Sequence, residues 1–72
     1  MLDWQDADSS WVAAIAYDLA AEIIFVRLSD GAEWCYEACP IDVWEAFTAP
    51  GQSRGQYINQ VLKHKPNHRV TA

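Results

Sequence analysis

Apolar and polar residues alternate along the stretch from Ile23 to Pro40, on both sides of an Asp30-Gly31 pair. Five large apolar residues of the two arms have even numbers, Ile24, Val26, Leu28, Trp34 and Tyr36, whereas the charged residues Arg27, Glu33 and Glu37 have odd numbers. Because successive residues of a strand point to opposite faces of a sheet, this pattern predicts a β-hairpin with one apolar face.

The turn of this hairpin must keep even positions opposite even positions. A two-residue turn at Asp30-Gly31 would instead place each apolar residue opposite a polar one. A three-residue loop, with Gly31 in the left-handed region as part of a G1 bulge, avoids this mismatch. We therefore predict the bulged turn, in which Val26 pairs with Trp34, Ile24 with Tyr36 and Arg27 with Glu33.

An earlier strand is predicted between Ser10 and Tyr17, where the residues alternate in size but none is charged. A strand without a polar face is typical of a central position in a sheet. With a four-residue loop over residues 18–21, Ile15 would lie opposite Ile24 and Trp11 opposite Leu28. The three strands would then form an antiparallel meander with one continuous apolar face.

Two helices are predicted after the meander. Cys39-Pro40 marks the start of the first helix, and Pro50-Gly51 marks its end. Ser53, followed three residues later by Gln56, has the spacing of a capping box, so the second helix is expected to begin near Arg54 and to end before Pro66. The apolar stripes of the two helices are formed by Val43, Trp44 and Phe47 and by Tyr57, Ile58, Val61 and Leu62.

The predicted fold is α+β: a three-stranded antiparallel meander followed by two helices packed on one sheet face (βββαα). With 72 residues the chain has room for one domain, expected over residues 10–70. Residues 1–9 are expected to form a loose acidic arm that pins Trp4 to the body, and the last five residues a short extended tail.

Charge is distributed unevenly along the chain. The net charge is −5, all ten acidic residues lie between Asp3 and Glu45, and four of the five basic residues follow residue 50. A uniformly acidic body would repel nucleic acid and anionic membranes, so any anionic partner is expected at the basic last third. The chain has no apolar run long enough for a membrane span and no basic amino-terminal signal, which predicts a cytoplasmic protein with free thiols.

Cys35, Cys39, His64 and His68 resemble a Cys2His2 zinc site in their spacing within each pair. The 24 residues between Cys39 and His64 are too many for a zinc finger, whose loop has about 12. We therefore expect no metal and no cofactor. No nucleophile motif, Gly-rich phosphate loop or carboxylate pair stands out, so the chain is not predicted to be an enzyme. Trp34 and Tyr36 could stack on bases, but same-face aromatic residues in a meander are more typical of a core.

Several short motifs, in order, resemble the KTSC domain family over about residues 9–70. The matching positions are Ser10, Val12, Ile15, Tyr17, Asp18, Ile24, Val26, Leu28, Gly31, Trp34-Cys35-Tyr36, Cys39-Pro40, Ser53, Gly55, Tyr57, Asn59, Lys63 and Pro66. The chain departs from the family pattern at Trp34, where the family has Tyr, and at Cys39, where it usually has an aliphatic residue. The family is named for its occurrence at the carboxyl end of some lysyl-tRNA synthetases.

The resemblance implies a small non-enzymatic module, and the company of a synthetase suggests RNA as the partner. We therefore expect the second helix and the tail to bind RNA or another anionic partner. The candidate residues are Arg54, Asn59, Lys63, Lys65 and Arg69. The alternative is a protein-interaction module that uses exposed aromatic residues such as Trp4 or Tyr57. Charge geometry separates the two, because scattered bases would remove most support for RNA.

Overall fold

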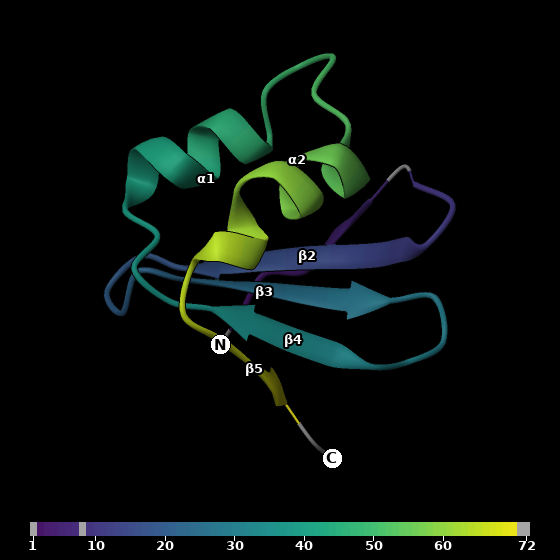
Figure 1. Cartoon of the computed structure of the whole chain (residues 1–72), viewed down its shortest axis with the longest axis horizontal. Helices are drawn as coiled ribbons and strands as arrows, with labels where there is room; N and C mark the ends of the chain where they lie inside the picture. Colours follow the sequence, from purple (N-terminus) through teal and green to yellow (C-terminus); the bar gives the residue numbers. More distant parts are fainter. Residues whose placement is uncertain (1, 8, 71–72) are drawn as a thin grey trace.

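The computed structural model describes residues 2–7 and 9–70, which form a five-stranded antiparallel sheet covered on one face by helices (Figure 1). The sheet order follows the chain, β1-β2-β3-β4-β5. The elements are β1 (Gln5–Asp6), β2 (Val12–Asp18), β3 (Ile23–Leu28), β4 (Glu33–Tyr36), α1 (Ile41–Phe47), α2 (Arg54–Gln60), the 3-10 helix η1 (Leu62–His64) and β5 (Asn67–Val70). The α+β class and the two helices on one face are confirmed.

The predicted count of three strands is wrong, because a short strand is added at each edge of the meander. On one side β1 pairs with β2, and on the other β5 pairs with β4. Both edge strands are short and mostly polar and exposed, so they lack the apolar alternation by which a strand is recognised. The expected extended tail is therefore a paired strand as far as Val70, and residues 71–72 lie outside the described part.

The expected acidic arm contributes β1, so the structure attaches this part of the arm to the sheet. The guanidinium of Arg27 lies 4.2 Å from the ring centroid of Trp4, a cation–π contact that holds the indole against the body. Residues 1 and 8 of the arm are not among those that the structure describes.

The β3–β4 hairpin has the predicted register. Ile24 lies opposite Tyr36, Val26 opposite Trp34 and Arg27 opposite Glu33. Gly31 has φ +94°, and its N–H donates to the Leu28 carbonyl at 2.9 Å. The Arg27–Glu33 pair forms a salt bridge with Nε and Oε2 2.8 Å apart. The parity of the apolar positions therefore identified the turn correctly.

The predicted register of β2 against β3 is wrong. Ile15 lies opposite Val26, and Val12, not Trp11, lies opposite Leu28. Two features cause the shift: the turn occupies residues 19–22, one position later than expected, and a bulge interrupts the ladder between Val12 and Ala14. The bulge changes which positions face the helices, so Val12 is buried while Trp11 is 38% exposed.

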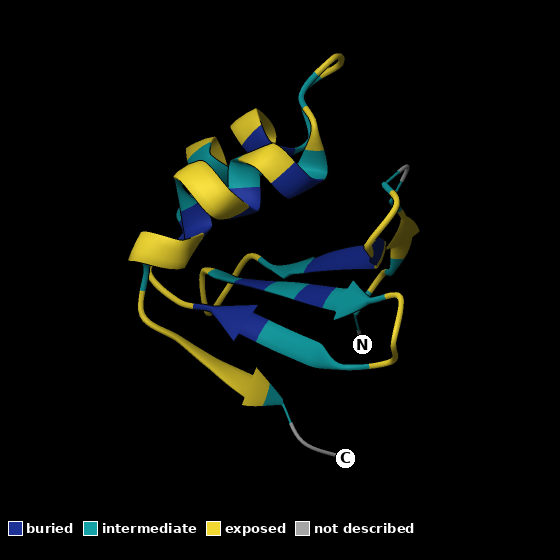
Figure 2. Cartoon of the chain, turned by 45° about the vertical axis from the view of Figure 1, so that its right-hand side comes forward, coloured by how far each residue is buried: buried dark blue, intermediate teal, exposed yellow. Residues whose placement is uncertain are grey.

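The core lies between the sheet and the helices (Figure 2). Phe47 of α1, Ile58 of α2 and Leu62 of η1 are buried there, as the helical stripes predict. Ser53 caps α2 by accepting a hydrogen bond from the Gln56 N–H, which confirms that part of the predicted capping box. The buried core residues are Val12, Ile15, Ile24, Val26, Tyr36, Cys39, Phe47, Ile58 and Leu62.

Candidate binding groove

An open groove of about 320 Å³ lies where α2 and η1 meet the strands. Its lining residues come from every element around it: Trp11, Leu28, Trp34, Tyr36, Ile58, Asn59, Lys63 and Asn67. Three aromatic rings, two amides and one ammonium group therefore share one depression. Groups of these kinds can stack on a planar ring, hydrogen-bond its edge and neutralise an anion.

Trp11 reaches the groove because of how the chain enters β2. The Trp11 carbonyl accepts a hydrogen bond from the Ser29 N–H at 3.0 Å, and the Ser29 hydroxyl donates to the Ser10 carbonyl at 3.3 Å. These bonds fasten residues 10–11 to the end of β3. The indole then lies against the backbone of α2 at Gly55, where a Cβ would stand 2.5 Å from Trp11 Nε1. Glycine is therefore needed at position 55 for the indole to lie where it does.

The β4–β5 pairing brings polar groups of the tail beside the aromatic residues of β4. Tyr36 lies opposite Asn67 and Trp34 opposite Arg69. Directly opposite residues of antiparallel strands project from the same face, so Arg69 lies on the groove side next to Trp34. The Asn67 amide donates to the Lys65 carbonyl at 2.8 Å, which fixes the end of the groove. Burial raises the pKa of Tyr36, so its phenol is neutral at physiological pH.

The structure brings together three of the five residues that were expected to bind an anion. Asn59 and Lys63 line the groove, and Arg69 projects beside it. Lys65 does not line the groove; its charge lies near Cys39, where it opposes the pKa increase that burial gives the thiol. The basic residues are thus divided between surfaces, which removes most of the support that their clustering in the sequence gave to RNA binding.

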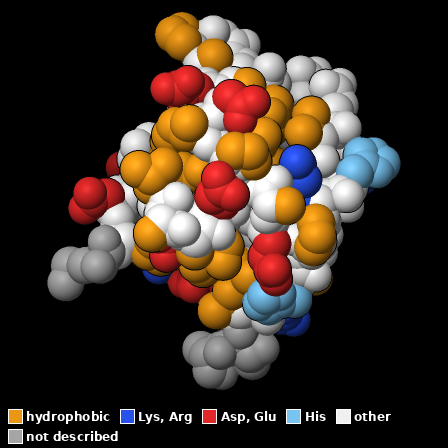
Figure 3. All heavy atoms as spheres, turned by 90° about the vertical axis from the view of Figure 1, so that its left-hand side faces the viewer, with side chains coloured by type: hydrophobic (Ala, Val, Ile, Leu, Met, Phe, Trp, Pro, Cys, Tyr) orange, Lys and Arg blue, Asp and Glu red, His pale blue; other side chains and the backbone are white. Residues whose placement is uncertain are grey.

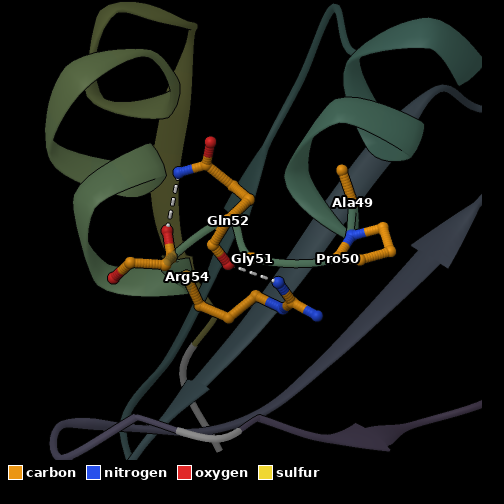
Figure 4. A pocket seen from close by; sticks show the side chains of 6 residues that line it. Ala49, Pro50, Gly51, Gln52 and Arg54 are labelled. Atoms are coloured by element: carbon orange, nitrogen blue, oxygen red, sulfur yellow. Dashed lines mark hydrogen bonds between the residues drawn. The ribbon is translucent and has the colours of Figure 1, made fainter.

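Arg54 is engaged in the loop between the two helices (Figure 4). One guanidinium nitrogen donates to the carbonyls of Phe47, at 3.1 Å, and Gln52, at 2.7 Å. The guanidinium also lies 5.9 Å from the Phe47 ring centroid. A second hollow, of about 290 Å³, is lined by residues 49–54 around this side chain. Arg54 therefore ties the end of α1 to the start of α2.

The four residues with zinc-like spacing do not assemble. Cys35 and His68 meet as cross-strand partners, with Sγ and Nε2 3.0 Å apart, and His68 Nδ1 lies 3.4 Å from Glu37 Oε2. Burial raises the pKa of the Cys35 thiol, an effect that a hydrogen bond from the His68 backbone opposes. Within residues 2–7 and 9–70 no group of three His, Cys, Asp or Glu side chains has the arrangement of a metal site. In that same part of the chain, no helix is long and apolar enough to cross a membrane.

Sequence reasoning missed two lining residues of the groove. Trp11 was expected to lie opposite Leu28 within the meander. The bulge in β2 removes it from that position, and the sequence does not indicate this bulge because Ala13 and Ala14 are both small and apolar. Asn67 belongs to β5, which was not predicted as a strand. Trp34 and Tyr36 were expected in the core, and Tyr36 is buried there while also lining the groove.

Comparison with known proteins identifies the family. The family model for the KTSC domain matches residues 8–65. A protein of Tsukamurella paurometabola is 32% identical over 68 residues, which cover 94% of this chain and 97% of the relative. An uncharacterised protein of Stutzerimonas stutzeri is 38% identical over 60 residues, or 83% of this chain and 80% of that protein.

The fold also matches a solved structure. The crystal structure of a KTSC domain protein from Yersinia pestis superposes with a TM-score of 0.86 and 19% identity, covering 99% of this chain and 100% of that one. At this identity the likeness shows a shared fold. With the family model matching over most of the chain and a relative alignable along nearly its whole length, this chain belongs to the KTSC domain family.

Proposed function

We propose that the chain is a small, non-enzymatic module that binds single-stranded RNA weakly in the groove between α2 and β4–β5. The observation that carries this proposal is the composition of the groove: Trp11, Trp34 and Tyr36 share it with Lys63, Asn59 and Asn67. Aromatic rings stack on bases of any sequence, and a nearby cation contacts the phosphate. The cytoplasmic location expected from the sequence is part of the same proposal.

The aromatic residues set the character of the site. Trp11 is 38% exposed and Trp34 is half-buried, so parts of both indoles are open to a ligand. Stacking contributes about 1–3 kcal/mol per base, measured by substitution with alanine. A groove of about 320 Å³ is comparable in size to a site for one small molecule, which suits one unstacked base rather than a helix.

The charge near the groove limits the expected affinity. Two cations, Lys63 and Arg69, are placed to contact phosphates, whereas Arg54 and Lys65 lie elsewhere. Two contacts with single-stranded nucleic acid predict a slope of log affinity on log salt of about −1.4, shallower than the −2 to −3 expected for three or four contacts. The net charge of −5 further weakens attraction to RNA at long range.

The non-enzymatic part of the proposal is supported by the state of the thiols. Cys35, next to His68, has the pairing of a nucleophile with a base, but the residue is 3% exposed and its thiol pKa is raised by burial. Nucleophilic cysteines are accessible and have a lowered pKa. Cys39 is fully buried, and its pKa is also raised by burial.

The test is a titration of fluorescently labelled single-stranded RNA, and of a transfer RNA, followed by anisotropy at several salt concentrations. We expect dissociation constants of about 100 µM at low salt and similar values for different RNA sequences. Lys63→Gln and Arg69→Gln should each reduce the salt slope by about 0.7. Trp34→Ala should weaken binding by at least about fivefold, whereas Trp34→Phe should retain most of it.

Lys65→Gln is the matched control, since it removes the same charge two residues away from Lys63 but outside the groove. Equal effects of Lys63→Gln and Lys65→Gln would show diffuse attraction instead of a site. Absence of binding at low salt, with protein at about 100 µM, would reject RNA as the ligand.

A further inference from the structure

The β2–β3 turn and the first turns of α1 form a surface of their own at one end of the molecule, on the left in Figure 1. Two large apolar side chains are exposed there, Leu19 at 63% and Ile41 at 44%. Figure 3 looks directly at this end: hydrophobic side chains cover much of the face, acidic side chains stand among them, and Lys and Arg are few. We call this surface the acidic end and define it by Leu19, Ile41, Asp18, Glu22, Asp42 and Glu45.

Three contacts hold the two segments of the acidic end together. The Cys39 N–H donates to the Glu22 carbonyl at 2.9 Å, and the Tyr17 hydroxyl donates to the Cys39 carbonyl at 2.6 Å. The rings of Tyr17 and Trp44 stack with centroids 5.1 Å apart and planes within 8°. The exposed groups are therefore carried on a pre-organised support, which lowers the entropic cost of binding a partner.

The acidic end carries four carboxylates, those of Asp18, Glu22, Asp42 and Glu45. Burial raises the pKa of Tyr17, and the negative charges of Glu22, Asp42 and Asp18 raise it further. Among residues 2–7 and 9–70, the ion pairs are Arg27 with Glu33 and His68 with Glu37, so neither these acids nor Glu45 forms an ion pair within that part of the chain. Lys65 stands at the margin, near Cys39.

A shallow hollow lies beside these charges. It has a volume of about 400 Å³ and is lined by Leu2, Tyr17, Asp18, Leu19 and Ala20. Its walls combine the side chains of Leu2, Leu19 and Ala20 with Tyr17 and the Asp18 carboxylate, so it can take a cationic side chain beside an apolar one. Exposed apolar groups surrounded by unpaired charge of one sign are characteristic of a docking site for a partner of the opposite sign.

We propose that the acidic end docks a basic amphipathic segment of a partner protein, in which large apolar side chains sit between lysines or arginines. The apolar anchors contact Leu19 and Ile41, and the cations meet Glu22, Asp42 and Glu45. Charge complementarity selects this occupant, because an acidic or neutral segment would leave the carboxylates unpaired. This site shares no lining residue with the groove, so RNA binding and docking can be tested by different substitutions.

The experiment uses the full chain, labelled with ¹⁵N, and a synthetic helical peptide with leucines at i, i+3, i+4 and i+7 flanked by lysines. Two comparison peptides separate the contributions: one replaces the leucines with serine, and the other replaces the lysines with glutamate. We expect amide shifts confined to residues 17–22 and 41–46 with the first peptide only. Leu19→Ser should weaken its binding by about tenfold.

The charge is tested with the matched double variants Asp42→Asn/Glu45→Gln and Asp6→Asn/Asp30→Asn, which remove the same net charge at different places. The first variant should bind the peptide about threefold or more weakly, and the second should bind it with unchanged affinity. Lys63→Gln, which tests the groove, should also leave peptide binding unchanged. Amide shifts spread over all acidic surfaces, or equal binding of the serine peptide, would overturn the proposal. Sedimentation showing that a second copy of the chain occupies this end would also overturn it.

Discussion

The indole of Trp11 occupies the space that a side chain at position 55 would need, so the residue before β2 determines which amino acid α2 can carry there. A Cβ on Gly55 would lie 2.5 Å from Trp11 Nε1 and 3.0 Å from Cε2. Gly55 is buried and has no unusual backbone conformation. The contact with Trp11 therefore explains why position 55 is a glycine.

Gly55→Ala is therefore expected to destabilise the protein although alanine is the better helix former. The intrinsic gain is about 1 kcal/mol, whereas displacing a packed indole costs about 1–3 kcal/mol. Urea unfolding should show a lowered midpoint, and Trp fluorescence should shift to longer wavelength as the indole moves into water.

The control is the same substitution in a Trp11→Ala background. With the indole absent, Gly55→Ala should raise the midpoint instead of lowering it, because only the helix propensity is left. The same sign of effect in both backgrounds would contradict the contact.

Leu62→Ala should cost about 2–4 kcal/mol, because Leu62 is fully buried in the core cluster and its truncation leaves a cavity there. That is a large share of the stability available to a domain of this size. Equilibrium urea unfolding measures it, with Gln60→Ala on the exposed side of α2 as the control. A midpoint as little changed as that of the control would mean that η1 does not pack as described.

Stability should fall at alkaline pH. Burial and the nearby carboxylates raise the pKa of Tyr17, so the folded state holds the phenolic proton more tightly than the unfolded state. This contribution is fully present below the unfolded pKa of about 10 and is lost as pH rises through the folded value. Thermal melts across this range should show the fall.

Tyr17→Phe should lower stability by about 1 kcal/mol at neutral pH, since the hydrogen bond to the Cys39 carbonyl is lost, and should reduce the alkaline fall. The fall should not vanish, because burial also raises the pKa of Tyr36 and of Tyr57. An alkaline profile identical to that of the wild type would count against the role given to Tyr17.

Chelators should leave the melting temperature unchanged. Cys39 lies in the core and donates its thiol proton to the Glu37 carbonyl at 3.4 Å, while Cys35 contacts His68 at the sheet. The two thiols therefore lie in different environments and do not form a common metal site. A drop of several degrees with a zinc chelator would show that metal contributes to folding.

The sequence was most informative where polarity alternates. Arg27 and Glu33 mark one face of the β3–β4 hairpin, and this is why both its register and its bulged turn could be predicted. In β2 the residues from Val12 to Ala16 carry no polar group, so nothing in the pattern distinguishes a regular strand from a bulged one. The prediction therefore placed Trp11 within the sheet, opposite Leu28, and missed its place in the groove.

Charge gave a similarly partial view of the site. Lys63 and Arg69 could be identified as candidates from their position after residue 50; Lys63 lines the groove, and Arg69 lies opposite Trp34 beside it. Arg54 satisfies the same criterion, yet its guanidinium is used inside the loop. Sequence shows that a cation is present, but its hydrogen-bond partners depend on carbonyls that only the folded backbone presents.

Arg54 and Lys63 should therefore respond in opposite ways to the same substitution by methionine. Arg54→Met removes the bonds to the Phe47 and Gln52 carbonyls and should lower the free energy of unfolding by about 1–3 kcal/mol. Its salt dependence of RNA binding should match that of the wild type. Lys63→Met, at an exposed position, should change stability by no more than about 0.5 kcal/mol but reduce the salt slope by about 0.7. Urea unfolding and anisotropy titrations measure the stability and the salt slope of both variants. If Arg54→Met reduced the salt slope and Lys63→Met lowered the stability, Arg54 would belong to the RNA site and Lys63 would not.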